Sequence, residues 1–523
     1  MESVLDFLMR RTRNIRKSGS DGLGMLPHMS DSTIAWEPWT PAAFARAAAE
    51  RKPILLSLTA SWCRGCDVMD AVTYADPRIA SIVREAFVPL RVDTDRRPDV
   101  NARYNLDGWP TTALLTPGGE MLTGSTYLTP DAMLQMLEAA ATAMRERYDE
   151  LMARAEQAAL LRRSQPPPPR YEPDGEAPAW LVSRMVDEED REHGGFGAGG
   201  KFLSAEPVRL ALAVAARQAD ERLTALIVRT LDAVCWRGLF DEVDGGFFRY
   251  AANRDFSRPH TEKLLEDQVA LVPLLLDAAR RTGRIGYHRR AGDVVRYVHR
   301  TLADPEGGVF FASQQADEEY YASSGSIRRT LEPPPIDRTI FTDLNGQAIA
   351  AWLDAAPGLD GSGLDGVALR AVDRVILPAF VPGEGLRHWS APDAPAGLLT
   401  DQVHGARALL GAATAAGRDD CLTLAAAIMD AAVERLWDAR GGGFFDRAPG
   451  ADDVGLLRDP RKPLALNSLA ACVLRRLGDL TGDVRMRARA RETLGSLTGR
   501  YRTEGLAAAP YAVAVLDVLG SPA

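Results

Sequence analysis

Residues 54–69 read ILLSLTASWCRGCDVM, and this stretch decides how the first part of the chain is expected to fold. The apolar run at its start predicts a buried strand. The strand leads into Trp62-Cys63-Arg64-Gly65-Cys66, which places two cysteines at the start of a predicted helix. The positive end of the helix dipole, together with Arg64, favours the thiolate of Cys63. Cys66 follows one helical turn later and can resolve a mixed disulfide, so the stretch predicts a redox dithiol.

Two other interpretations of the cysteine pair are a zinc half-site and two inert core residues. Zinc would require two more ligands at a similar spacing. The remaining cysteines, Cys235, Cys421 and Cys472, occur singly and have no histidine in register. We therefore favour the redox interpretation, and we predict neither a metal nor a cofactor.

The residues after the dithiol predict more of a small α/β fold. A strand is expected at 87–93, a helix at 98–104, and a third strand at 113–115, which ends in the hairpin turn Gly118-Gly119. Together, the Trp-Cys-x-x-Cys motif and the Trp109-Pro110-Thr111 segment resemble the thioredoxin fold over about residues 35–148. The resemblance implies that Pro110 is a cis-proline facing the dithiol. Thioredoxin has a buried aspartate where this chain has Ser57, so the resemblance assigns no proton acceptor.

Composition limits the classes of function. The chain has 523 residues, of which 46% are hydrophobic and 25% charged, enough for two or three globular domains. A net charge of -9 argues against a nucleic-acid partner, and no segment has the roughly 20 apolar residues of a membrane span. Five cysteines are too few for a disulfide scaffold, so we expect a reducing compartment, the cytoplasm.

Four domain segments are expected. Residues 1–30 are predicted to form a loose tail, with a basic stretch at 10–17, and residues 31–150 the thioredoxin-like domain. A long helical pattern at 131–161 ends before four consecutive prolines, which favour an extended spacer, so 151–178 is predicted to be a helix end and linker. Residues 179–523 form the second large domain.

That second domain repeats itself. Glycine-rich aromatic loops recur at 193–196, 244–247, 306–310 and 440–444, with weaker versions at 383–387 and 504–505. About twelve helical patterns lie around these loops, for example at 223–236, 262–279, 346–355, 423–436 and 464–477. Two helices for each of six loops predict an all-α (α/α)6 toroid of the six-hairpin glycosidase-like kind. An elongated solenoid is the alternative.

A dense polar cluster in the toroid gives the first candidate site. It contains His260, Glu262, Lys263 and Asp267, at the start of the helix expected at 262–279. Helical spacing would place Glu262 and Glu266 on one face, and Lys263 with Asp267 on the adjacent one. These groups could act as general acid and base, or could equally form a capped helix with a solvated ion pair.

Further candidates are Asn345, Asp401 and His404, each near the start of an apolar helix. Such residues are more often helix caps than catalysts. In a closed toroid, however, the starts of inner helices would converge on one rim. That convergence is the reason for retaining the three residues as candidates.

The whole chain resembles the spermatogenesis-associated protein 20 family, in which a thioredoxin-like domain precedes a six-hairpin toroid. The matching residues include Trp36, Cys63, Cys66, Gly194-Gly195-Phe196-Gly197, Gly245-Gly246-Phe247, Pro259-His260, Glu262-Lys263 and Asp267-Gln268. The resemblance implies a dithiol at Cys63 and Cys66, and a cavity containing His260, Glu262, Lys263 and Asp267. It supplies no substrate. This chain departs from the family at Arg64-Gly65 and at Asp67, where the family usually has His-Trp and His.

Three functions remain open. The chain could be a thiol-disulfide oxidoreductase whose toroid docks a protein client. Alternatively, the toroid could be a carbohydrate-active hydrolase or epimerase, with the thioredoxin-like domain regulatory or structural. Thirdly, both halves could only bind. The intact dithiol favours the first, and the expected partner is a thiol or disulfide client or a small saccharide-like ligand.

Overall fold

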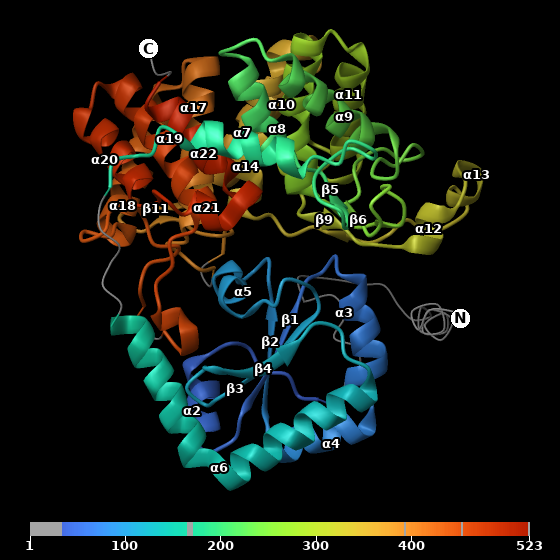
Figure 1. Cartoon of the computed structure of the whole chain (residues 1–523), viewed down its shortest axis with the longest axis vertical. Coiled ribbons are helices and arrows are strands. Elements are labelled where there is room, and N and C mark those ends of the chain that lie inside the picture. The colour runs from blue at the N-terminus through green and yellow to red at the C-terminus, as the bar shows by residue number, and fades with distance from the viewer. Residues whose placement is uncertain (1–33, 165–170, 392–393, 451–452, 521–523) are drawn as a thin grey trace. The chain divides into compact units, whose positions relative to one another are not determined.

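The computed structural model describes residues 34–164, 171–391, 394–450 and 453–520. The expected N-terminal tail and the four prolines at 166–169 lie outside these residues. The chain divides into two compact units (Figure 1). The first comprises Met1–Pro166 together with Pro449–Pro460, and the second comprises Pro167–Ala448 and Arg461–Ala523.

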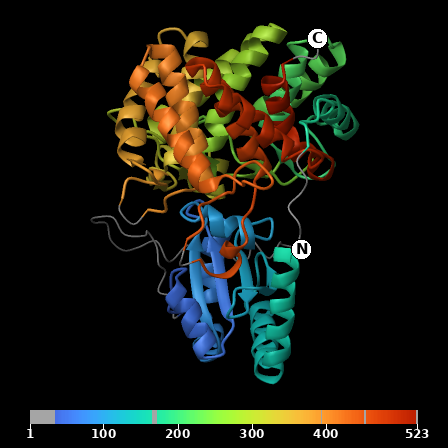
Figure 2. The same ribbon diagram turned by 90° about the vertical axis from the view of Figure 1, so that its left-hand side faces the viewer.

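The first unit is built on a four-stranded sheet. Its strands are β1 (Ile54–Thr59), β2 (Val88–Asp93), β3 (Thr111–Leu115) and β4 (Met121–Ser125), in the order β2-β1-β3-β4. β1 runs parallel to β2 and antiparallel to β3, and β3 runs antiparallel to β4. Figure 2 shows these strands lying side by side. This is the thioredoxin-like arrangement that the sequence predicts.

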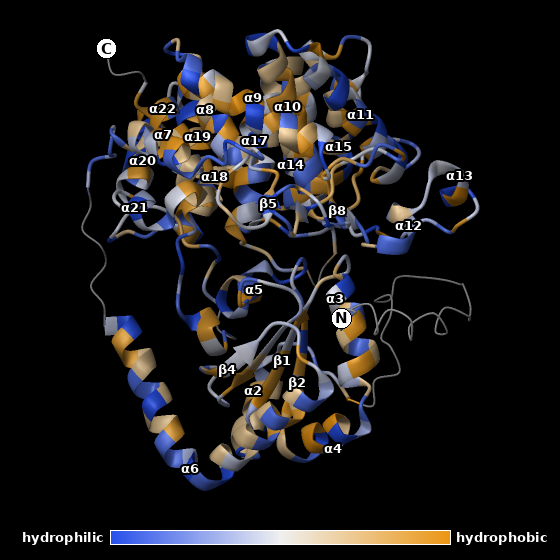
Figure 3. Ribbon diagram, turned by 45° about the vertical axis from the view of Figure 1, so that its right-hand side comes forward, coloured by the Kyte–Doolittle hydropathy of each residue, from blue (hydrophilic) through white to orange (hydrophobic). Residues whose placement is uncertain are grey.

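Helices cover both faces of the sheet, because consecutive residues of β1 are apolar and point to opposite faces. Leu56 and Leu58 pack on one face with α2 (Pro41–Ala49) and α5 (Pro98–Tyr104), whereas Leu55 packs on the other with α4 (Pro77–Ala86) and α6 (Pro130–Ser164). α3 (Arg64–Met69) continues into a π-helical turn, η2 (Asp70–Tyr74). In Figure 3, β1 is drawn in the hydrophobic colour between these helices. The helix expected at 131–161 is present, with a break at Arg147.

The segment Pro449–Pro460 belongs to the first unit, whereas the sequence predicts it to be part of the toroid. It contains the short 3-10 helix η5 (Gly455–Arg458). Val454 and Leu457 are buried in the same cluster as α5, and the backbone N–H of Leu456 donates to the Tyr104 hydroxyl at 2.8 Å. The Arg103 guanidinium donates to the carbonyl of Leu456 at 2.7 Å. The segment belongs here because its apolar side chains fill a gap over α5.

The second unit is a ring of helices. The inner helices are α8 (Ala205–Ala215), α10 (Leu265–Thr282), α14 (Thr342–Ala355), α17 (Leu399–Ala416), α19 (Leu464–Thr481) and α22 (Ala509–Val518). Each contacts the next, and α22 packs against α8, which closes the ring. The outer helices are α7 (Ala177–Glu188), α9 (Glu221–Trp236), α11 (Ile285–Thr301), α15 (Leu364–Ala371), α18 (Asp419–Leu436) and α20 (Val484–Gly495). The closed (α/α)6 toroid is confirmed, and the solenoid alternative is wrong.

Short elements complete the inventory. The second unit also contains β5 (Lys201–Phe202), β6 (Tyr250–Ala251), β7 (Pro259–His260), β8 (Lys263–Leu264), β9 (Ser313–Gln314), β10 (Ile336–Asp337), β11 (Phe380–Val381), β12 (Gly385–Leu386), α12 (Glu318–Ala322), α13 (Gly325–Arg328), α16 (Leu377–Ala379) and α21 (Tyr501–Glu504). Among the described residues, none of the helices combines the length and the apolar character needed to cross a bilayer.

The glycine-rich loops connect outer helices to inner ones and share one geometry. In the loop after α9, the N–H of Gly245 donates to the Asp241 carbonyl, and the N–H of Asp241 donates to the Gly246 carbonyl. The same pair of bonds recurs around Asp190 and Asp438, and around Asp304 the carbonyl accepts instead from the N–H of Gly307. Gly246 has a φ of +81°, and a Cβ there would lie 2.6 Å from the ring of Tyr297, so a larger residue does not fit.

Candidate functional site

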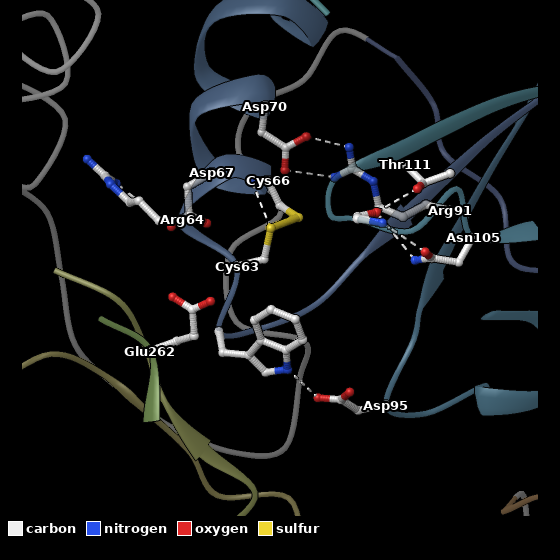
Figure 4. Close-up of a disulfide and its surroundings, with 12 residues drawn as sticks. Cys63, Arg64, Cys66, Asp67, Asp70, Arg91, Asp95, Asn105, Thr111 and Glu262 are labelled. Carbon is white, nitrogen blue, oxygen red and sulfur yellow. Dashed lines mark hydrogen bonds and ion pairs between the residues drawn. A yellow bond between two sulfur atoms is a disulfide. The ribbon is translucent and has the colours of Figure 1, made fainter. Parts of the chain in front are cut away.

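The dithiol lies where the sequence predicts it, at the junction of β1 and α3. Cys63 and Cys66 form a disulfide, and Cys63 is the N-cap residue of α3 (Figure 4). The backbone N–H of Cys66 donates to Sγ of Cys63 at 3.0 Å. Both cysteines are nearly buried, with exposed fractions of 4% and 5%, so exposure does not distinguish them. The hydrogen bond and the helix dipole favour a thiolate on Cys63 in the reduced state.

The Trp109-Pro110 turn lies beside the dithiol motif. The peptide between these residues is cis, as the resemblance to thioredoxin implies. A Cβ on Gly65 would lie 3.1 Å from Cδ of Pro110, so a glycine at this position allows the proline ring to approach the motif. The indole of Trp62 packs edge-on against that of Trp109 and donates to the Asp95 carboxylate at 2.9 Å.

An acid follows the dithiol by one turn. Asp70 is four residues beyond Cys66 and therefore lies on the same side of the helix. Figure 4 shows the Asp70 carboxylate directed toward Arg91 of β2, whose guanidinium donates to both of its oxygens. Burial raises the pKa of Asp70, and the charge of Arg91 opposes that shift. Ser57, where thioredoxin has its aspartate, is buried on β1.

The toroid encloses a cavity of about 640 Å³. Its lining comes from all six inner helices, which confirms that it is the central cavity of the ring. Glu266 of α10 and His404 of α17 both line it. Glu266 lies inside the ring of helices, and its side chain is exposed to the cavity space.

The pKa values of two neighbouring acids on α10, Glu266 and Asp267, are raised above their usual range. Burial is the main cause that raises the pKa of Glu266, and Asp343 adds to it. The pKa of Asp267 is raised well above its usual value, first by burial and then by the charge of Glu266. Oδ2 of Asp267 has no hydrogen-bond partner within the described residues. A pair of carboxyl groups in this state can supply a general acid and a general base.

The expected helical start at Glu262 is wrong, because α10 begins at Leu265. Lys263 and Leu264 form β8, which pairs with β9, and this pairing holds the preceding residues extended. Glu262 therefore does not share a helical face with Glu266. Its Oε1 instead lies 3.4 Å from a guanidinium nitrogen of Arg249.

Lys263 is fully buried and braces the glycine loop. Its ammonium donates to Asp241 and to the carbonyl of Gly245, each at 2.7 Å. Lys462 makes the equivalent contacts with Asp438 and the carbonyl of Gly442, and Lys201 likewise pairs with Asp190 but donates to the carbonyl of Gly197. The recurrence points to an architectural task for these lysines. The role of Lys263 as a site residue is not tested by these contacts and remains a prediction.

Asn345 makes a second recurring contact. Its Oδ1 accepts from the N–H of Phe310, and its Nδ2 donates to the carbonyls of Phe310 and Phe341. The same clamp of one side-chain amide on a loop backbone is made by Gln268, Gln402 and Asn467. These four residues thereby fix the register of α10, α14, α17 and α19 against their loops.

The amide clamp explains why acids converge. Asp267 and Asp401 each precede a clamping glutamine by one residue, so they occupy equivalent positions in their repeats. Glu266 and Asp343 each precede a clamp by two residues and are likewise equivalent. Burial raises the pKa of Asp401 to about 6, partly offset by His388. The sequence singles out the segment 343–346 as a candidate, although only Asn345 of it is retained as a site residue, and it gives no signal for His388. Aligning the repeats on their clamping amides selects Asp343 as well.

The two predicted histidines are in different surroundings. Burial lowers the pKa of His404 to about 4, and its Nδ1 has no hydrogen-bond partner within the described residues. His260 is exposed and stacks on the ring of Tyr250, with centroids 4.0 Å apart. His404 therefore lies in the cavity with Glu266, whereas His260 does not line it.

Comparisons with known proteins agree with this architecture. The family model Thioredox_DsbH, described as "Protein of unknown function, DUF255", matches residues 20–162. Mouse spermatogenesis-associated protein 20 is 31% identical over 54% of this chain and 39% of its own length. The chain thus spans about two fifths of the length of that relative.

Two further similarities are shorter or more distant. Thiol:disulfide interchange protein DsbD of Campylobacter jejuni is 29% identical over 17% of this chain and 16% of its own length. The solved structure of cellobiose 2-epimerase from Bacillus thermoamylovorans has a TM-score of 0.51 and is 12% identical. It covers 62% of this chain and 86% of its own, and at this identity it shows the toroid fold alone.

Proposed function

Because the chain is homologous to spermatogenesis-associated protein 20 over about half of its length and carries a thioredoxin-like domain, we propose that it is a thiol-disulfide oxidoreductase. The observation that carries this proposal is the position of Cys63. It caps α3, accepts the N–H of Cys66 and belongs to a motif bordered by Pro110.

The reaction proceeds in two exchanges. The thiolate of Cys63 attacks one sulfur of a client disulfide, and the other client sulfur leaves as a thiolate. Cys66 then attacks Sγ of Cys63, which releases the second client thiol and leaves the Cys63–Cys66 disulfide. The client gains two electrons, and the dithiol loses them. The reverse sequence oxidises a client.

We assign the proton of Cys66 to the Asp70 carboxylate. Asp70 is one turn beyond Cys66, and its pKa is raised by burial, which brings a carboxylate closer to the role of a base. Arg91 fixes its orientation. Replacing Asp70 with Asn is expected to slow the second exchange by about 100-fold. Asp67→Asn, on the same helix, is the matched control.

The direct test is reduction of a small disulfide substrate by the pre-reduced full chain. Cys63→Ser is expected to abolish reduction, and Cys66→Ser is expected to accumulate a mixed disulfide at Cys63, seen by mass spectrometry. Turnover that survives Cys63→Ser would contradict the proposal. The activity is assigned to the cytoplasm, since few cysteines and an oxidisable dithiol suit a reducing compartment. The toroid would dock a protein client, with no nucleic acid or membrane as partner.

A second candidate function concerns the toroid and a small saccharide-like ligand. The supporting observation is the cavity that brings Glu266 and His404 together, with the acid Asp267 adjacent on α10. Such groups could move protons in hydrolysis or epimerisation. A panel of saccharides tested for binding and turnover, with Glu266→Gln and Asp267→Asn, examines this candidate. Binding of none of them would leave only the oxidoreductase proposal.

A further inference from the structure

Three potential ligands meet at the starts of two adjacent inner helices. Asp343 lies in the first turn of α14, Asp401 in the first turn of α17, and His388 in the connection between them. Nδ1 of His388 is hydrogen-bonded to Oδ1 of Asp401 at 2.9 Å and lies 3.9 Å from Oδ1 of Asp343. One ligand atom from each residue lies within 4.8 Å of the other two.

The two acids of this cluster have no cationic side chain paired with them other than His388 in the part of the chain that the structure describes. A second histidine and acid cluster in the chain provides the contrast. There, Asp190 is neutralised by Lys201 at 2.8 Å and by Arg254 at 2.7 Å. Two carboxylates facing one imidazole leave a net negative charge even when the imidazole is protonated.

One carboxylate oxygen of the cluster is buried without a hydrogen-bond partner among the described residues. Asp401 is fully buried, and its Oδ2 accepts no hydrogen bond from any described residue. Leaving a buried carboxylate oxygen without a donor or a cation is costly. The neighbouring acid is held in place, because the Thr400 hydroxyl donates to Oδ2 of Asp343 at 3.0 Å and the N–H of Leu344 donates to Oδ1.

We propose that Asp343, His388 and Asp401 bind one divalent first-row transition-metal ion. Metal–ligand bonds of about 2.0–2.2 Å place ligand atoms roughly 3–4 Å apart, which matches the separations of His388 from the two acids. One imidazole with two carboxylates suits zinc or manganese better than the all-oxygen site of calcium. The ion would supply the positive charge that the cluster lacks. This assignment goes beyond the dithiol activity and does not depend on it.

The sequence carries no metal motif at these three residues, which occur in separate segments. His388 precedes Asp401 by thirteen residues, and Asp343 is in another repeat. The usual close spacing of metal motifs is therefore missing. Only the amide clamps, which register α14 and α17 against their loops, bring the ligands together.

The test uses the full chain after dialysis against a chelator, titrated with Co²⁺ and followed by visible absorption. One bound Co²⁺ per chain, displaced by Zn²⁺, is expected for the wild type. Asp401→Asn, Asp343→Asn and His388→Gln are each expected to weaken binding by about 100-fold or more, since each removes a direct ligand. Thr400→Val removes only the group that orients Asp343, so a loss of about 10-fold is expected.

Two comparisons keep the result decisive. Glu192→Gln in the other histidine and acid cluster should leave Co²⁺ affinity unchanged. Metal should also raise the melting temperature of the wild type but not that of Asp343→Asn. This variant is chosen because Asp343 is more exposed than the other two ligands, so its replacement perturbs the fold least. The proposal is overturned if the wild type binds no Co²⁺, or if the three ligand variants bind it as tightly as the wild type.

Discussion

Sγ of Cys63 accepts a hydrogen bond from the backbone N–H of Cys66 at 3.0 Å. This bond, rather than exposure, separates the two thiols, because both are about equally buried. In the reduced protein we expect the thiolate on Cys63 and therefore preferential alkylation there. Limiting iodoacetamide followed by peptide mass spectrometry measures the ratio. Main labelling of Cys66 would contradict the assignment.

The other thiols provide an internal control for that measurement. Burial raises the pKa of Cys421 to about 11, and it also raises the pKa of Cys235 and Cys472. We expect all three to remain unlabelled at neutral pH while the chain is folded. Labelling of all five cysteines at similar rates would indicate unfolding and not a reactive dithiol.

Gly65 is predicted to be intolerant of a side chain. In Gly65→Ala the new Cβ would lie 3.1 Å from the Pro110 ring and 3.5 Å from the carbonyl of Trp109. We expect the motif to shift, at a cost of about 1–3 kcal/mol in the free energy of unfolding, and disulfide exchange to slow. Denaturant unfolding and the rate of substrate reduction measure the two effects. Gly118→Ala is the matched control, since its nearest neighbour would be 3.7 Å away.

Much of the first unit could be predicted from the sequence. The apolar run of β1 and the proline that opens α5 act locally, so the structure places both elements where expected. The contribution of residues 449–460 could not be predicted. Leu456 and Tyr104 are 352 residues apart, and neither carries a local signal of the other.

The toroid also combines features that can be predicted from the sequence with features that cannot. Its glycine loops are short, repeated motifs, and they predict the six-fold architecture. The start of α10 was misjudged because the pairing of Lys263 with Gln314 in β9 overrides a favourable helical pattern. His388 lies in a connecting segment without periodicity, so only the folded structure places it beside Asp401.

The contact between α5 and the segment 449–460 depends on Tyr104. Its hydroxyl accepts from the N–H of Leu456 and donates to the carbonyl of Gly119, both at 2.8 Å. Tyr104→Phe leaves both buried backbone groups unpaired, so we expect a loss of about 1–3 kcal/mol in stability. Hydrogen exchange of the peptide containing Leu456 should also accelerate. Tyr148→Phe should change neither quantity.

His404 predicts an acid sensitivity of the toroid. Burial lowers its pKa to about 4 in the folded state, below the ordinary 6.5. As pH falls below 6.5, the unfolded chain binds the proton first, so stability is lost between about pH 6.5 and 4. The loss attributable to His404 is up to about 3 kcal/mol.

The measurement for His404 is the denaturation midpoint as a function of pH. His404→Gln should reduce the slope of the profile between pH 6.5 and 4, because glutamine does not titrate and the contribution of position 404 is lost. His288→Gln, which removes a histidine outside the toroid cavity, should retain the wild-type slope. Equal slopes for all three proteins would show that His404 is not held neutral by burial.

The amide of Asn345 is predicted to be architectural. In Asn345→Asp the side chain keeps its shape, but the two bonds that Nδ2 donates to Phe310 and Phe341 are lost. The variant also places a charge at a fully buried position without a cation, so we expect a loss of about 3 kcal/mol or more. Thermal and denaturant unfolding measure this loss. Asn253→Asp, at an exposed loop position, should cost little by comparison. The contrary result would be an Asn345→Asp variant that unfolds at the same temperature and denaturant concentration as the wild type but no longer turns over a saccharide. Asn345 would then act in catalysis, and its amide would not be what holds α14 to its loop.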